Sequence, residues 1–219
     1  MEPERATARK SPSKAGTGNA DHTSAYQPIY NIVGEKVALG PGDREEQIAL
    51  FHRSDNDFAV TIFSGDPLRP VTRAQTEADY DHWSKEDPSR AVGFLIYDRA
   101  TGTAIGAVSL RHIDPVRQTA EYGIVISDKA YWGKGYGTEA TQLILDYGFT
   151  VLGLHNVLLM TYAYNERAIR AYKRAGFREI GRWREAMRIG TRRYDVLYMD
   201  CLASEFTSPL QPVVAYPGE

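Results

Sequence analysis

Apolar residues are spaced along this chain in two ways, in short runs and at every third or fourth position. The second spacing is clearest for Ala140, Leu143, Ile144, Tyr147 and Val151, which would form one stripe of an amphipathic helix. The short runs, bounded by turn residues, are typical of strands. On these patterns the sequence predicts helices at about 43–52, 73–85, 140–151 and 166–175, and strands at 36–39, 91–97, 103–112, 119–127, 157–160, 177–189 and 192–202.

The order of these elements predicts a mixed, mostly antiparallel sheet with helices on both faces. The strands at 103–112 and 119–127 would pair with each other, and a turn at Gly190 and Thr191 would join the last two strands as a hairpin. Residues 58–69 contain a Gly-Asp-Pro turn and are expected to form a loop. The fold class is therefore an α/β layered domain.

The two ends of the chain differ from its centre. Residues 1–27 are rich in Ser, Thr, Ala, Lys and Gly and have almost no large apolar side chains, so they cannot offset the entropy of ordering. The last residues include Pro209, Pro212 and Pro217. In a chain of 219 residues we therefore expect a disordered arm at 1–27, one folded domain at 28–206 and a loose tail at 207–219.

Composition excludes several classes of protein. The net charge of −2 argues against a general binder of nucleic acid or another polyanion. A single cysteine, Cys201, excludes an internal disulfide and fits a reducing cytoplasm. No run approaches about 20 apolar residues, and the N-terminus lacks an apolar core segment, so neither a membrane span nor a secretory signal is expected.

Residues 131–138, Tyr-Trp-Gly-Lys-Gly-Tyr-Gly-Thr, separate the strand at 119–127 from the following helix. Gly133, Gly135 and Gly137 have no Cβ, so a ligand can approach their backbone closely. The first amides of a helix lack partners, and the helix dipole favours an anion at that end. The segment therefore predicts a pyrophosphate site. The alternative is a glycine turn that binds nothing.

The spacing of these glycines excludes two common nucleotide-binding loops. A P-loop requires Gly-x4-Gly-Lys followed by Ser or Thr, and the dinucleotide fingerprint requires Gly-x-Gly-x-x-Gly. The order here is Gly-x-Gly-x-Gly, with no Lys-Ser or Lys-Thr pair after it.

A second motif follows about 30 residues later, Asn165-Glu166-Arg167-Ala168-Ile169-Arg170-Ala171-Tyr172, which continues to Gly176-Phe177. Together the two motifs resemble the GNAT superfamily of N-acetyltransferases, over about residues 34–206. The resemblance is closest to the branch of ribosomal-protein alanine and spermidine acetyltransferases, to which residues 145–152 and 165–169 are similar. One position departs: Trp132 stands where the family usually has Gln or Arg.

The resemblance implies a GNAT-like fold and acetyl-CoA as the acyl donor, with no metal. It implies that the pantetheine pairs with the backbone of Val125, Ile126 and Ser127, that Asn165 bonds a pantetheine amide, and that Tyr172 protonates the departing thiolate. The pyrophosphate would lie against the loop. The cofactor-binding residues of the loop are then Gly133, Lys134, Gly135, Tyr136, Gly137 and Thr138.

Each candidate side chain has a plainer interpretation. Tyr172 could be a core tyrosine, and Asn165 an ordinary helix N-cap. Glu121 is a candidate general base on the strand leading to the loop, but it could instead form a cross-strand ion pair with Arg111 or Arg117, leaving the proton to a water chain. The histidines form no metal or triad pattern, and Cys201 is expected to be a packed thiol.

The sequence therefore predicts an N-acetyltransferase that moves acetyl directly from acetyl-CoA to a primary amine, without a covalent enzyme intermediate. The acceptor is a protein N-terminus, a polyamine or another small amine. The alternatives are a non-catalytic acyl-CoA-binding regulatory module and a transferase of another acyl group such as succinyl. The sequence leaves a homo-oligomer open.

Overall fold

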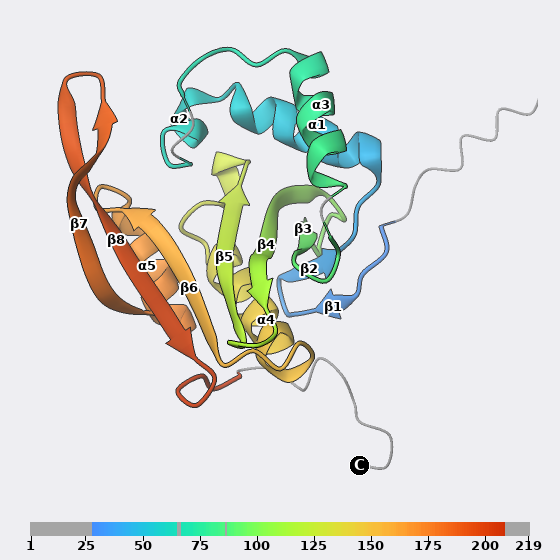
Figure 1. The fold of residues 1–219 in the computed structure, drawn as a ribbon. Coiled ribbons are helices and arrows are strands. Elements are labelled where there is room, and N and C mark those ends of the chain that lie inside the picture. Colours follow the sequence, from blue (N-terminus) through green and yellow to red (C-terminus); the bar gives the residue numbers. More distant parts are fainter. Residues whose placement is uncertain (1–27, 65–66, 86, 209–219) are drawn as a thin grey trace, which may run out of the picture.

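The computed structural model describes residues 28–64, 67–85 and 87–208. The arm expected at 1–27, and all of the expected tail except residues 207 and 208, lie outside them. Within the described ranges eight strands form one sheet in the order β1-β2-β3-β4-β5-β6-β8-β7 (Figure 1). Their bounds are β1 Ile32–Val33, β2 Val37–Gly40, β3 Val92–Asp98, β4 Ala104–Asp114, β5 Thr119–Ile126, β6 Asn156–Tyr162, β7 Arg178–Ile189 and β8 Arg192–Leu202.

All neighbouring strands are antiparallel except β5 and β6, which are parallel. The pairing of β4 with β5 and the β7–β8 hairpin confirm the predictions. β1 was not predicted, because its two residues are too few to show a pattern.

The helices are α1 Arg44–Asp55, α2 Phe58–Thr61, α3 Arg73–Trp83, α4 Tyr136–Thr150 and α5 Glu166–Ala175, with a single 3₁₀ turn at Lys129–Tyr131. Local capping explains where α1 and α3 begin. The Asp43 carboxylate accepts from the Glu46 amide at 2.8 Å, and Thr72 forms a reciprocal capping box with Gln75. No helix in these ranges is long and apolar enough to cross a membrane.

Helices cover both faces of the sheet, as predicted. α4 packs Leu143 and Ile144 into the main core on one face, where Ile96 of β3 also points. Leu50 of α1 packs against Leu95 and Tyr97 on the opposite face. This alternation along β3 is what a strand with helices on both sides requires.

The prediction of a loop over 58–69 was wrong at its start. Residues 58–61 form α2, which begins because the Asp57 carboxylate accepts from the Ala59 amide at 3.0 Å. One turn is too short to show a periodic apolar pattern, so α2 could not be predicted from periodicity. α1 also continues to Asp55, beyond the expected end near 52.

The strands β5 and β6 meet only at one end. Their pairing covers Thr119 to Glu121 of β5 and Asn156 to Leu158 of β6. Beyond these residues the two strands diverge (Figure 1). The far half of β5 therefore has a backbone edge that none of the described strands covers. The start of α4 and the helix α5 lie beside this opening.

Candidate active site

A cavity of about 340 Å³ lies where β5 and β6 diverge. Its walls come from four segments: α2 and the residues after it, the end of β5, the glycine loop with the start of α4, and α5. The residues that line it include Phe63, Ile124, Val125, Ile126, Trp132, Gly133, Gly135, Gly137, Thr138, Asn165, Arg167, Arg170, Tyr172 and Arg174. The two sequence motifs therefore meet at one cavity, although about 30 residues separate them.

The open edge of β5 is formed by alternate residues. The Ser127 amide donates to the Ile105 carbonyl of β4 at 2.9 Å, so the polar backbone groups of Ser127 and Val125 point towards β4. Those of Ile124 and Ile126 then point towards the cavity. Of the three residues expected to pair with a ligand, Val125 and Ile126 line the cavity and Ile126 turns its polar backbone groups towards it. Ligand pairing by Val125, Ile126 and Ser127 stays a prediction. The Ser127 hydroxyl is buried and has no partner among the described residues.

The glycine loop exposes the first amides of α4 to the cavity. Gly133 and Gly135 have φ of +73° and +94°, which side-chain-bearing residues rarely adopt. Gly135 is the N-cap of α4, and no side chain of the described residues caps that end. The amides of the first turn are therefore available to an anion. Lys134 and Tyr136 do not line the cavity. The Tyr136 hydroxyl bonds Asp98 instead, at 3.5 Å.

Tyr172 belongs to both the core and the cavity wall. Its ring packs edge-on against Tyr122 and Phe177, with centroid distances of 5.8 and 6.0 Å. Burial raises the pKa of its phenol to about 12, although the nearby Arg167 opposes this shift. The group is therefore protonated at neutral pH. No hydrogen bond to its hydroxyl is present among the described residues.

Asn165 is the N-cap of α5, which confirms the plainer interpretation of this residue. Its Oδ1 accepts from the Ala168 amide at 3.2 Å, and only 7% of the residue is exposed. Asn165 also lines the cavity, and its Nδ2 takes no part in the cap. Gly176 ends the same helix in a left-handed conformation with φ +114°.

Glu121 lies away from the cavity, in the paired end of β5. Its Oε2 is 3.0 Å from His112 Nδ1, and its Oε1 is 3.9 Å from the Arg111 guanidinium. The expected cross-strand ion pair with Arg111 is therefore confirmed, whereas Arg117 pairs with Asp114. Val125 lies four residues further along the strand, which corresponds to roughly 13 Å.

Comparison with known proteins identifies the family. The family model described as "Acetyltransferase (GNAT) domain" matches residues 38–178.

The chain belongs to the GNAT acetyltransferase family.

The relatives of this GNAT protein include enzymes named for a polyamine and one named for the ribosome. The spermidine N(1)-acetyltransferase of Escherichia coli K12 is 45% identical over 142 residues, which cover 64% of this chain and 72% of the relative. YdaF of Bacillus subtilis, named as a ribosomal N-acetyltransferase, is 32% identical over 112 residues, 51% of this chain and 59% of the relative.

The solved structures include the spermidine N-acetyltransferase of Vibrio cholerae in complex with CoA and spermine. It superposes with a TM-score of 0.70 at 26% identity, and the match covers 78% of this chain and 98% of that one. An acetyltransferase of Bacillus anthracis has the same fold, with a TM-score of 0.67 at 21% identity and coverage of 81% and 100%.

Sequence reasoning on this GNAT protein missed three residues of the cavity wall. Phe63 was placed in a featureless loop, Arg167 was noted only as part of its motif, and Trp132 was noted only as a departure from the family pattern. In the structure the Arg167 guanidinium lies 3.4 Å from the centre of the Trp132 ring, and Phe63 meets that ring edge-on at 6.0 Å. No local pattern could have brought these three segments together.

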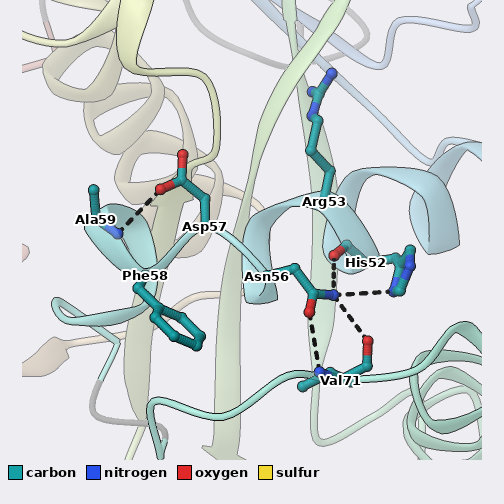
Figure 2. A pocket seen from close by; sticks show the side chains of 7 residues that line it. All are labelled: His52, Arg53, Asn56, Asp57, Phe58, Ala59 and Val71. Carbon is teal, nitrogen blue, oxygen red and sulfur yellow. Dashed lines mark hydrogen bonds between the residues drawn. The ribbon is translucent and has the colours of Figure 1, made fainter.

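A second hollow of this GNAT protein, of about 640 Å³, lies at the end of α1 (Figure 2). The Asn56 side chain joins the end of α1 to the segment before α3. Its Nδ2 donates to the His52 and Val71 carbonyls at 2.8 and 2.9 Å, and its Oδ1 accepts from the Val71 amide. Asp57 caps α2 and forms an ion pair with Lys129. These polar groups hold α2 in place, and nothing in the hollow resembles a set of reacting groups.

Proposed function

We propose that this protein is an N-acetyltransferase that moves the acetyl group of acetyl-CoA directly to a primary amine, with a polyamine such as spermidine as its acceptor. The single observation that carries the proposal is the cavity between β5 and β6. It combines an open strand edge, free helix amides and a protonated phenol. The polyamine acceptor is supported by the spermidine acetyltransferases among the relatives. Residues 28–206 would form the catalytic domain.

The acyl donor has a suitable contact for each of its parts. The pyrophosphate would accept from the amides of the loop and of the first turn of α4. The pantetheine amides would pair with the backbone of Ile124 and Ile126, as an added strand does. The NH₂ group of Asn165 would donate to a pantetheine carbonyl. Arg174 faces the cavity from α5 and adds positive charge for the phosphates.

The chemistry requires little of the side chains. The neutral amine attacks the thioester carbonyl, and a backbone amide on the open β5 edge can donate to the oxyanion that forms. The C–S bond then breaks, and the thiolate takes the proton of the Tyr172 hydroxyl; the phenoxide left behind regains a proton from solvent water before the next turnover. A tyrosine phenol is protonated at neutral pH, and the raised pKa of about 12 extends this to alkaline pH. No covalent bond to the enzyme forms at any stage.

The amine must lose a proton during the reaction. Glu121 is held in ion pairs at the closed end of β5 and does not line the cavity. We therefore propose that water in the cavity, rather than Glu121, carries this proton to solvent.

The test is release of CoA thiol from acetyl-CoA across a panel of polyamines, peptides with free N-termini and aminoglycosides. We expect spermidine and spermine to give the highest kcat/KM. Preference for a peptide would replace the polyamine with a protein N-terminus. Tight CoA binding without thiol release for any amine would favour the regulatory module, and faster turnover with succinyl-CoA would change the acyl group.

A further inference from the structure

Three side chains from distant segments meet at the cavity: Phe63 after α2, Trp132 in the glycine loop and Arg167 in the first turn of α5. The Arg167 guanidinium is 3.4 Å from the centre of the Trp132 ring and 5.2 Å from that of Phe63. All three residues line the cavity. They connect the β5 side of the opening with the α5 side, across the region where β5 and β6 diverge.

The guanidinium of Arg167 has no hydrogen-bond acceptor within the part of the chain that the structure describes. Among the described residues it forms neither an ion pair nor a hydrogen bond, whereas Arg170, one turn later, pairs with Glu166 at 3.2 Å. Arg167 is partly buried, and this desolvation lowers the pKa of its guanidinium. A partly buried charge without a carboxylate is costly, and a planar guanidinium is well suited to a phosphate. The arrangement therefore favours an anionic ligand.

The Trp132 indole occupies a hydrogen-bond acceptor on the open edge of β5. Its Nε1 donates to the Ile126 carbonyl at 2.8 Å, and this carbonyl lies on the edge of β5 that no strand covers. A ligand that extends along this edge and donates an amide N–H would compete with the indole for the same oxygen.

We propose that Trp132 and Arg167 form a closed pair that the acyl donor separates. The indole leaves the Ile126 carbonyl to a pantetheine amide, and the guanidinium moves from the indole face to a phosphate of CoA. The inference rests on the proposed function, because it names how the same cavity admits its donor. The indole thus acts against binding, and the guanidinium acts for it.

Tryptophan fluorescence tests the separation. The protein has three tryptophans, and the other two, Trp83 and Trp183, are 50% and 59% exposed on α3 and β7. Titration with CoA should change the emission of the wild-type protein and of Trp183→Phe, and should leave the emission of Trp132→Phe unchanged. An equal change in Trp132→Phe would overturn the proposal, because the signal would then come from elsewhere.

Calorimetry separates the two roles, with pantetheine as the probe that lacks phosphates. Trp132→Phe keeps a ring for Arg167 but loses the N–H, so it should bind both pantetheine and CoA about threefold to tenfold more tightly. Arg167→Met should weaken CoA by about tenfold or more and leave pantetheine nearly unchanged. Arg170→Met, which removes a guanidinium already paired with Glu166, is the matched control and should weaken CoA much less.

Two results would overturn the inference alone: a Trp132→Phe protein with wild-type affinities, or an Arg167→Met protein that loses pantetheine as strongly as CoA. Melting curves of each variant distinguish these results from a failure to fold. A folded wild-type protein that binds no CoA would instead overturn the proposed function, and the inference with it.

Discussion

At the scale of single residues, Tyr172 has two tasks that a substitution can separate. Its ring packs in the core against Tyr122 and Phe177, while its hydroxyl remains without a partner among the described residues. The ring accounts for the position of α5, and the hydroxyl is left for chemistry.

We predict that Tyr172→Phe lowers kcat by roughly 10²-fold and leaves acetyl-CoA affinity nearly unchanged, because only the proton donor is lost. The pH dependence of kcat in the wild-type protein should be consistent with this role. Since burial raises the pKa of this phenol to about 12, its ionisation cannot reduce kcat at neutral or mildly alkaline pH. Steady-state kinetics of the wild-type protein and of Tyr172→Phe from pH 6 to pH 10 measure the loss in kcat and its pH dependence. Wild-type turnover in the variant, where chemistry limits the rate, would leave Tyr172 with the packing role alone.

At the scale of elements, the turn from β5 into α4 depends on two glycines in different ways. Gly135 has φ +94° and would strain any side chain. Gly137 lies inside the helix, where an added Cβ would be 3.7 Å from Ile126 Cγ1, an ordinary contact. An alanine at 137 therefore tests whether a ligand approaches the loop, whereas an alanine at 135 tests the strain of a positive φ.

We predict that Gly137→Ala keeps the stability of the wild-type protein but weakens CoA binding by about tenfold, because the methyl group adds bulk where the ligand must approach the amides. Gly135→Ala should also lower the free energy of unfolding, by about 1 to 2 kcal/mol. Urea unfolding and CoA titration of both variants check this. Unchanged CoA affinity in folded Gly137→Ala would place the pyrophosphate elsewhere.

At the scale of the whole molecule, several weak acids are held in their protonated forms by burial. The pKa values of Tyr164 and Tyr172 are raised to about 12, and that of Cys201 from 9.0 to about 11. Tyr122 is shifted in the same direction, because it is buried beside Tyr172. The buried position of Cys201 confirms that it is a packed thiol.

These shifts predict a loss of stability in alkaline solution. The unfolded chain releases these protons from about pH 9 to 10 upwards, whereas the folded chain keeps them until about pH 11 to 12. The unfolded state therefore binds fewer protons in this window. The stabilising contribution is complete below pH 9 and is lost as the pH rises towards 12. Urea midpoints at pH 8 to 11 should fall steadily, and less steeply in Tyr164→Phe. Equal slopes for the two proteins would contradict the assignment to Tyr164.

The sequence by itself determined the features that depend on neighbouring residues. The caps at Asp43 and Thr72, the helix at 166–175, the terminal hairpin and the glycine loop were all recognisable. The physical reason is that periodicity, capping and glycine conformations act over only a few positions. The pair of motifs, read together, was also sufficient to indicate the family.

Only the tertiary structure decided how these pieces face one another. The divergence of β5 from β6 selects Ile124 and Ile126 as the open edge, and the Ser127 amide is already bonded to Ile105 of β4. The same folding places Glu121 beside Arg111 and His112, away from the cavity. It also stacks Arg167 on Trp132. Such contacts join residues far apart along the chain, and no local pattern carries them, because they depend on the packing of the whole sheet with its helices.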